Sequence, residues 1–273
     1  MSHTIAFIGG GNMGGAILRA VCRAIPPEQV LLFDTDRAKA EALAAETGCG
    51  LAPDGSAAVR AARYVFLCVK PQVFASVVAG LLPALREGAA CGEFRTLVSI
   101  AAGLQLSDIR TMLNGLPVPL IRIMPNTPAA LGKGTLLITQ EPDGPQAAME
   151  ELKQLLTPCG LLVVVSEHEL DLGSAISGCG PAYMYLFIEA LADGGVQAGL
   201  SRTLAQTLAA QTMLGSAAMV LESGLHPGAL KDAVCSPGGT TIAGVAELEN
   251  RGFRAAAAQA VMAACRRNFE LRG

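Results

Sequence analysis

Three glycines near the start of the chain have the spacing of a phosphate-binding turn. Residues 4–8 read TIAFI, an apolar strand, and GGGNMGG follows directly before an apolar helix. The first glycine of such a pattern permits a tight turn, the second lets backbone N–H groups approach a pyrophosphate, and the third lets the helix pack closely on the strand. Ordinary strand-to-helix turns can also carry glycines, but this context favours a dinucleotide site. The predicted contacts are Gly9, Gly11, Asn12, Met13 and Gly14.

An acidic residue ends the next predicted strand. Asp34 lies 20 residues beyond Gly14, where a carboxylate typically accepts the ribose 2′-hydroxyl of NAD and repels the 2′-phosphate of NADP. Arg37 could bind that phosphate, although a solvated loop charge is an equally good interpretation. We expect NADPH or NADH as the cofactor, and Asp34 favours NADH.

Two later segments follow strands whose carboxyl ends should border the same cofactor. Val69, Lys70 and Pro71 come after the third predicted strand, and Ala101 and Ala102 come after the fourth. Small side chains would let a nicotinamide ring lie close to the backbone. Lys70 could instead be a surface lysine. We predict cofactor contacts at these five residues.

A second unusual stretch, VCSPGGTTIAG at residues 234–244, interrupts a region that otherwise reads as consecutive helices. Proline and two glycines end one helix, and the next begins near Thr240. No histidine or carboxylate stands at the break. It could be a plain connection between helices with Thr240 as the N-cap, or a binding site at the new helix start.

The order of the predicted elements indicates the fold class. Residues 4–160 alternate β-rich runs with amphipathic helices, which is typical of a parallel sheet with helical crossovers. Beyond about Asp171, apolar residues recur only at helical spacing. Ser201, Gly224 and Pro227 are predicted as an N-cap, a helix stop and a first-turn proline. The predicted strands are Thr4–Ile8, Val30–Phe33, Tyr64–Val69, Thr96–Ile100, Leu120–Met124, Gly134–Thr139 and Leu161–Val165.

We therefore predict an α/β fold class with two domains. Residues 1–165 would form a Rossmann-like dinucleotide-binding domain with a parallel sheet, and residues 166–273 an all-helical domain. The helical part is rich in alanine and other apolar residues. One chain would have difficulty covering every helix face, so we expect subunit association.

Composition excludes several classes of partner. The 273 residues include 20 basic and 23 acidic ones, a net charge of −3, so neither nucleic acid nor a membrane surface is expected. The eight cysteines form no C-x-x-C pair and no histidine cluster has metal-ligand spacing, so we expect reduced thiols and no metal. Apolar segments such as 161–165 are far short of the roughly 20 residues that cross a bilayer. With no signal-like N-terminal run, we expect a soluble, cytoplasmic protein acting on a small metabolite.

Several sequence blocks together resemble one enzyme family. FIGGGNMGGA, VKPQ, SIAAG, RIMPNTPA, ISGCGPAY and LKDAVCSPGGTTIAGVAELE occur in order over essentially the whole chain. They are similar to those of pyrroline-5-carboxylate reductase. The glycine fingerprint is shared by many oxidoreductases, whereas the P-G-G-x-T break is close to the family's own signature.

The resemblance implies hydride transfer from NADPH or NADH to the C=N carbon of 1-pyrroline-5-carboxylate, which gives L-proline. It also implies a homodimer with intertwined helices, active sites near the dimer interface, and larger rings of dimers in some members. Residues 124–127, which include Asn126, would form a loop facing the nicotinamide. The residues implied to hold the substrate carboxylate and ring nitrogen are Ser236, Gly238, Gly239 and Thr241.

The chemistry of these residues agrees with that role. Backbone N–H groups of Gly238 and Gly239, freed at a helix start, would form a pocket for the carboxylate. The hydroxyls of Thr240 and Thr241 could both cap that helix and touch the substrate. A protonated imine is already electrophilic, so positioning can carry most of the work without a strong acid. We predict Ser236 and Thr241 as the catalytic residues.

Some positions have simpler interpretations or depart from the family pattern. Asn126 could only stabilise a turn between two prolines, and residues 177–181 could be a closely packed helix start rather than an entrance near the cofactor. Many members carry an asparagine near the adenosine ribose where this chain has Gly55, and Cys179 replaces the commoner serine. A lone histidine before a proline, His226, is expected to be structural.

Two rival functions are compatible with the same fold class. A β-hydroxyacid dehydrogenase typically uses a lysine of its C-terminal domain as the acid-base group. From Gly160 onward the only lysine is Lys231, near the SPGG break, which weakens this alternative. A nucleotide-sensing protein without turnover would keep the fold, but the intact stretch 236–241 argues against it.

Overall fold

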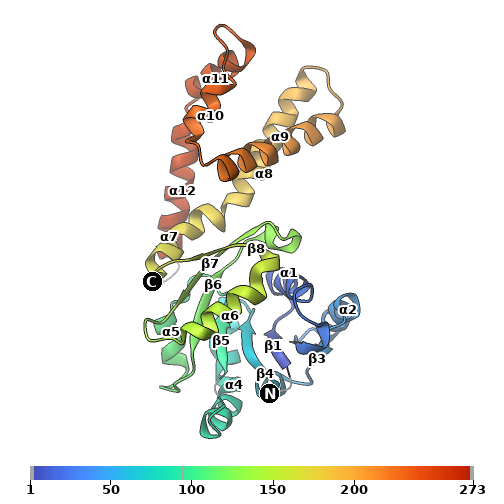
Figure 1. The fold of residues 1–273 in the computed structure, drawn as a ribbon, viewed down its shortest axis with the longest axis vertical. Helices are drawn as coiled ribbons and strands as arrows, with labels where there is room; N and C mark the ends of the chain where they lie inside the picture. The colour runs from blue at the N-terminus through green and yellow to red at the C-terminus, as the bar shows by residue number, and fades with distance from the viewer. Residues whose placement is uncertain (1–2, 94, 271–273) are drawn as a thin grey trace. The chain divides into compact units, whose positions relative to one another are not determined.

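A single twisted sheet organises the first part of the chain. The computed structural model describes residues 3–93 and 95–270, and its sheet has the strand order β3-β2-β1-β4-β5-β6-β7-β8. In Figure 1 this sheet covers the colours from blue to yellow-green. The strands are β1 (His3–Ile8), β2 (Val30–Phe33), β3 (Gly50–Leu51), β4 (Ala62–Leu67), β5 (Thr96–Ser99), β6 (Leu120–Met124), β7 (Gly134–Gln140) and β8 (Gly160–Val164).

Every strand predicted from the sequence is present, with ends shifted by at most two residues. The two-residue strand β3 was missed, because so short a run carries no alternating pattern. The predicted all-parallel sheet needs one correction, since β7 runs antiparallel to β6. A parallel connection needs a crossover of a dozen or more residues. The loop between Met124 and Gly134 holds only a short 3₁₀ helix, η2 (Thr127–Leu131), and so the chain turns back.

Helices cover both faces of the sheet. Alternate residues of β1 point to opposite sides: Ile5 and Phe7 join a core with α1 and α6, while Ala6 and Ile8 join a core with α3, α4 and α5. Each strand therefore anchors two helical layers, as expected for a buried parallel sheet. The elements are α1 (Asn12–Val21), η1 (Pro27–Gln29), α2 (Arg37–Thr47), α3 (Gly55–Ala61), α4 (Pro71–Ala90), α5 (Leu106–Met112), α6 (Gln146–Leu156) and η3 (Thr157–Cys159).

The described residues divide into two compact units. The first holds those up to Cys179 together with those from Cys265 onward, and the second is Gly180–Ala264. Each unit is described by itself below. The domain boundary predicted after residue 165 stays a prediction.

From Glu167 to Glu270 the structure shows only helices and connections, as the sequence predicts. Ser201 caps α9 by accepting a hydrogen bond from the Leu204 N–H, Gly224 ends α9 in the left-handed conformation, and Pro227 opens α10. His226 caps α10 through a hydrogen bond from the Gly228 N–H to its Nδ1 at 3.0 Å, which is the expected structural role. The helices are α7 (Glu167–Ser177), α8 (Gly180–Gln197), α9 (Arg202–Ser223), α10 (Pro227–Ala233), α11 (Thr240–Asn250) and α12 (Phe253–Glu270).

The second unit buries almost none of its own apolar surface. Among its described residues, only three alanines count as buried hydrophobics, whereas Leu186 is 67 % and Leu221 is 77 % exposed. A helical layer with so many uncovered apolar side chains requires another surface to pack against. The expected need for subunit association therefore has a direct structural basis.

Three helical stretches are long and apolar enough to cross a membrane by length and composition: Pro71–Ala90, Glu167–Gln197 and Arg202–Ser223. The expectation that every apolar segment is too short to cross a bilayer is therefore wrong by length and composition, because polar residues interrupt the apolar runs within these helices. The first stretch is α4, which buries Phe74 and Val78 against the sheet. A helix that contributes to the core of the sheet is not available to lipid.

Candidate cofactor and substrate sites

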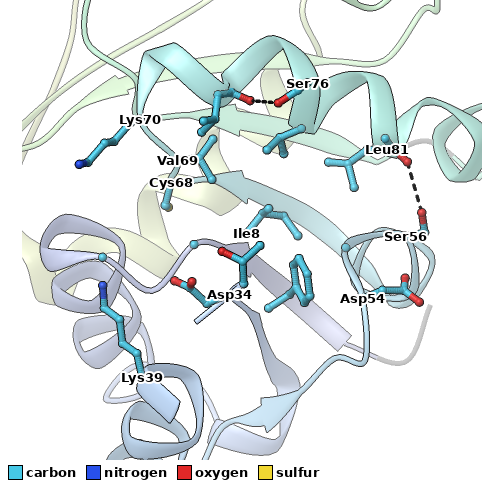
Figure 2. A pocket seen from close by; sticks show the side chains of 18 of the residues that line it. Ile8, Asp34, Lys39, Asp54, Ser56, Cys68, Val69, Lys70, Ser76 and Leu81 are labelled. Carbon is cyan, nitrogen blue, oxygen red and sulfur yellow. Dashed lines mark hydrogen bonds between the residues drawn. The ribbon is translucent and has the colours of Figure 1, made fainter. Parts of the chain in front are cut away.

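A cavity of about 750 Å³ opens at the carboxyl ends of β1, β2 and β4. This is the edge of a doubly wound sheet at which nucleotides bind. Figure 2 shows Asp34 and Lys39 on one side of it and Asp54 and Ser56 on another. Five of the predicted cofactor residues line the cavity, namely Gly9, Gly11, Asp34, Val69 and Lys70.

The glycine turn has the geometry that the sequence pattern predicts. Gly9 has φ +104°, and a Cβ there would lie 2.8 Å from the Cys68 carbonyl oxygen. A Cβ on Gly14 would overlap the Gly9 carbonyl oxygen and lie 2.8 Å from the Cβ of Cys68. At Gly11, by contrast, a Cβ would meet nothing within 4 Å. Two of the glycines are thus required for packing, whereas the third leaves the mouth of the turn open.

Helix α1 begins at the mouth of this turn. Gly11 is its N-cap and offers no side-chain cap, and the first intrahelical bond runs from the Gly15 N–H to the Gly11 carbonyl. Asn12, Met13 and Gly14 therefore present the first-turn N–H groups, which a helix cannot satisfy internally. These amides and the positive end of the helix dipole can hold a pyrophosphate.

Asp34 braces the turn as well as facing the cavity. Its Oδ2 accepts the Gly10 N–H at 2.6 Å, and its Oδ1 accepts the Asp36 N–H at 2.9 Å. Each oxygen keeps a second lone pair, so the carboxylate can still accept a ribose hydroxyl. Sequence reasoning identified Asp34 from its spacing but could not predict that the same carboxylate holds the glycine turn in place.

Lys39, and not Arg37, is the cation of α2 at the main cavity. Arg37 is 88 % exposed and pairs with Glu41 at 2.8 Å, which also raises the pKa of its guanidinium. Lys39 lines the main cavity, and Figure 2 shows its amine directed toward the glycine turn. The cation of α2 that faces the cavity is therefore Lys39, and no sequence signal prefers it over Arg37.

The segment 54–56 completes the cavity where the family pattern is broken. Asp54 caps α3 by accepting the Ala57 N–H at 2.7 Å. A Cβ on Gly55 would come within 3.0 Å of Leu81 Cδ2, so glycine leaves room between α3 and α4. Ser56 donates a hydrogen bond to the Gly80 carbonyl at 3.4 Å. Asp54 and Ser56 were not predicted as site residues, although they flank the substituted position.

The remaining predicted cofactor residues do not line this cavity. Pro71 is the first residue of α4, Ala101 is buried in the core below α5, and Ala102 is exposed beside it. Asn126 is only 8 % exposed. Cys68, below the glycine turn, is a thiol whose pKa is raised by burial, so it stays neutral there.

In the second unit, the SPGG break forms the N-terminus of α11. Gly238 has φ +67°, and Gly239 is the N-cap, with no side-chain cap hydrogen bond. The predicted capping by the threonine hydroxyls is therefore wrong, because Thr240 and Thr241 already lie inside the helix. A Cβ on Gly239 would overlap the Ser236 hydroxyl, so this glycine lets Ser236 lie directly against the helix start.

The amides available at the break also differ from those predicted. The Gly239 N–H donates to the Ser236 carbonyl at 3.0 Å, and the first helical bond reaches Gly239 from the Ala243 N–H. Among the described residues, the N–H groups of Thr240, Thr241 and Ile242 have no hydrogen-bond partner, and neither has that of Gly238. Of the two predicted amides, only that of Gly239 is used in the turn, and three first-turn amides of α11 are added to that of Gly238.

Within the described residues, no group of three or more His, Cys, Asp or Glu side chains could hold a metal ion. Lys231 pairs with Asp232. The polar groups gathered at the break are therefore hydroxyls and amides, which suit a carboxylate and a ring nitrogen.

Comparison with known proteins identifies both parts of the chain. A family model described as "Pyrroline-5-carboxylate reductase dimerisation" matches residues 167–271, and one described as "NADP oxidoreductase coenzyme F420-dependent" matches residues 4–103. A curated pyrroline-5-carboxylate reductase of Synechocystis is 43% identical, over 99% of this chain and 99% of its own length. This chain belongs to the pyrroline-5-carboxylate reductase family. The resemblance seen in the sequence blocks is confirmed.

Other members of the pyrroline-5-carboxylate reductase family support the assignment. The enzyme of Glycine max is 41% identical over 99% of this chain and 96% of its own. The solved Coxiella burnetii structure is 30% identical with a TM-score of 0.90 over the full length of both chains. The Plasmodium falciparum structure, solved with NADP bound, is 31% identical with a TM-score of 0.87 and covers 99% of this chain and 98% of its own. The predicted fold class is confirmed.

Proposed function

We propose that this protein reduces 1-pyrroline-5-carboxylate to L-proline with a hydride from NADPH or NADH, the last step of proline biosynthesis. The observation that carries the proposal is the start of α11, where three amides without partners follow directly on Gly239, which packs against the Ser236 hydroxyl, in a member of the family. A substrate with one carboxylate and one ring nitrogen needs that combination of donors.

The chain's own residues divide the work between binding and orientation. The amides of Thr240, Thr241 and Ile242 hold the substrate carboxylate at the positive end of α11. The Gly238 and Gly239 backbone shapes this pocket. The hydroxyls of Ser236 and Thr241 contact the ring nitrogen, where the product gains a hydrogen. These assignments rest on the geometry of the break and on the family resemblance.

The nicotinamide, when bound, supplies the hydride that reaches the C=N carbon, while the nitrogen electron pair takes up a proton. We assign cofactor binding to the glycine turn, with Gly9, Gly11, Asn12, Met13 and Gly14 at the pyrophosphate and Val69 and Lys70 on the opposite side of the cavity. Asp34 favours NADH by accepting the ribose hydroxyls, and Lys39 supplies the cation that allows NADPH. Pro71, Ala101 and Ala102 stay predictions of the sequence pattern.

A homodimer, or a ring of dimers, covers the exposed apolar faces of the second unit. Leu186 on α8 and Leu221 on α9 are mostly exposed in the single chain, and the region around them matches the dimerisation model of the family. Subunit contact also accounts for the apolar stretches 167–197 and 202–223 without a membrane. We place the protein in the cytoplasm, since its substrate and cofactor are small soluble metabolites.

One assay tests this function. The decay of NAD(P)H absorbance is followed after 1-pyrroline-5-carboxylate is added to the purified protein, with the two nucleotides in separate runs. Turnover with either nucleotide and formation of proline are the expected results. Absence of turnover with both at neutral pH would refute the reductase function. A β-hydroxy acid with the oxidised nucleotides serves as the control, and no turnover is expected with it. The rival dehydrogenase needs a free lysine as its acid-base group, whereas Lys231 is paired with Asp232.

A further inference from the structure

Both polar atoms of the Asn126 side chain bond to backbone groups of the protein. Its Oδ1 accepts the Thr135 N–H at 2.9 Å, and its Nδ2 donates to the Ser177 carbonyl at 2.8 Å. With 8 % of the residue exposed, the amide is buried and holds three segments together: the loop after β6, the start of β7 and the last residue of α7. A buried amide in this setting is a connector, because breaking either bond would leave a polar group unpaired.

A second attachment holds the other end of α7 to the same strand. Arg122, on β6, pairs with Asp171 at 2.9 Å and with Glu167 at 3.1 Å, and both Arg122 and Asp171 are almost completely buried. Glu167 also accepts the Leu106 N–H at the start of α5 at 2.7 Å. Four residues of extended chain from Arg122 to Asn126 span about 13 Å, and ten helical residues from Glu167 to Ser177 span about 15 Å. Helix α7 is therefore fixed to β6 and its following loop near both ends.

Helix α7 leads to the exit from the first unit and contacts α12, the helix through which the chain returns. The chain leaves the first unit after Cys179, two residues beyond Ser177, and returns at Cys265. On its return, Asn268 donates to the Asp171 carbonyl at 3.2 Å. At the exit, a Cβ on Gly178 would lie 3.5 Å from the Cε of Met124. The segment that follows β6 and the chain's exit point are thus held in contact within the first unit.

From these contacts we infer that Asn126 is a positioning residue for hydride transfer. It ties residues 124–127, the loop that the family resemblance places at the nicotinamide, to β7 and to the last residue of α7 within the first unit. It acts on the reaction through the placement of this loop and not by contact with the cofactor. The inference rests on the proposed function and replaces a direct cofactor contact at Asn126.

The substitution Asn126→Asp tests this role with almost no change of shape. An ionised carboxylate still accepts the Thr135 N–H but cannot donate to the Ser177 carbonyl. Its second oxygen would instead face the Ser177 carbonyl oxygen and repel it. We expect kcat to fall about tenfold to hundredfold, the cost of a small misplacement of reacting groups, with the KM for NADPH within about twofold of wild type. The primary isotope effect from 4-deuterated NADPH should rise, since hydride transfer becomes slower than the other steps.

A pH series gives a readout that loss of stability alone would not move. Burial raises the pKa of a carboxylic acid, and the protonated form can again donate to the Ser177 carbonyl. The kcat of Asn126→Asp, normalised to NADPH-binding sites counted by fluorescence titration, should therefore recover toward wild type as the pH falls from about 9 to about 6. Asn114→Asp is the matched control, since Asn114 lies in an exposed turn and its ratio to wild type should stay flat.

Several results would overturn the inference. Unchanged kcat in Asn126→Asp would do so, and a raised KM for NADPH at normal kcat would restore the direct cofactor contact. If Asn126→Asp does not fold, Glu167→Gln loosens the other attachment while its amide oxygen still accepts the Leu106 N–H. Its kcat should fall a few-fold, and a wild-type value would count against the role. If the wild-type protein has no turnover, the proposed function fails. The attachment of α7 by Asn126 can then still be tested, because Asn126→Asp should show faster amide hydrogen exchange in residues 172–180.

Discussion

Two glycines of the same turn should respond in opposite ways to the same substitution. Gly11→Ala adds a methyl group where the structure has no atom within 4 Å, and Gly11 already has φ −62°, which alanine adopts easily. The loss of chain entropy in the unfolded state stabilises such a variant by about 0.4–1 kcal/mol, and the poorer N-cap offsets this. We expect a Tm within a few degrees of wild type.

Gly14→Ala instead forces a methyl group against the Gly9 carbonyl oxygen and within 2.8 Å of the Cys68 Cβ. Overpacking of this kind costs about 1–3 kcal/mol. At about 2–4 °C per kcal/mol for a domain of this size, the Tm should fall by roughly 2–12 °C.

Cofactor binding separates the two variants again. The new methyl group of Gly11→Ala occupies the space into which a pyrophosphate would approach, so at least one hydrogen bond to a charged phosphate is lost. Such a bond contributes about 1.5–3 kcal/mol, which corresponds to about a 10- to 150-fold rise in the Kd of NADPH. Differential scanning fluorimetry and NADPH fluorescence titration measure both quantities. A Gly11→Ala protein that binds NADPH like wild type would refute the assignment of this turn to the pyrophosphate.

Four further outcomes are expected. Thr241→Ala should lower kcat/KM for the imine about tenfold with NADPH affinity unchanged, and a normal kcat/KM would reduce Thr241 to a helix residue. Asp34→Ser should shift the ratio of kcat/KM values toward NADPH, and an unaltered ratio would remove Asp34 from cofactor choice. Arg122→Met removes the cation that pairs with the buried Asp171 carboxylate and should cost about 3–5 kcal/mol in urea denaturation, whereas Arg122→Met with Asp171→Leu should regain most of it. Burial raises the pKa of the Cys159 thiol to about 12, whereas in the unfolded chain this thiol titrates near about 8.5. The contribution of Cys159 to the free energy of unfolding is therefore complete below about pH 8.5 and is lost as the pH rises toward 12. Urea titrations at increasing pH measure this loss.

The fold was predictable because its signals are local. Each strand but one is an apolar run with glycine, proline or charged residues at its ends, and the caps at Ser201 and Gly224 are set by single residues. The reversal at β7 was not predictable from apolar patterning, because a strand has the same composition in either direction. Only the short connection from Met124 to Gly134 carries that information.

The candidate site was likewise predictable only in part. Gly9, Gly11 and Asp34 could be found by spacing, because a tight turn and a ribose contact need fixed residue types at fixed positions. Lys39 could not be preferred over Arg37, since the choice depends on which side chain Glu41 binds. Likewise, only the three-dimensional structure shows that the Oδ1 and Nδ2 atoms of Asn126 both bond to the backbone. It also shows that the Gly239 N–H donates a hydrogen bond within the turn.

The uncovered helices of the second unit couple the folding of each chain to its association with another copy. With only three alanines buried there, a newly made polypeptide can complete its sheet alone, but its substrate-binding half must wait for an encounter with another copy. Under the proposed dimer, that last step is bimolecular, so stability depends on protomer concentration and dilution removes turnover before it removes nucleotide binding. A damaging substitution in one chain's helices would also disable a healthy partner, and mixtures of normal and mutant chains should lose more activity than their average predicts.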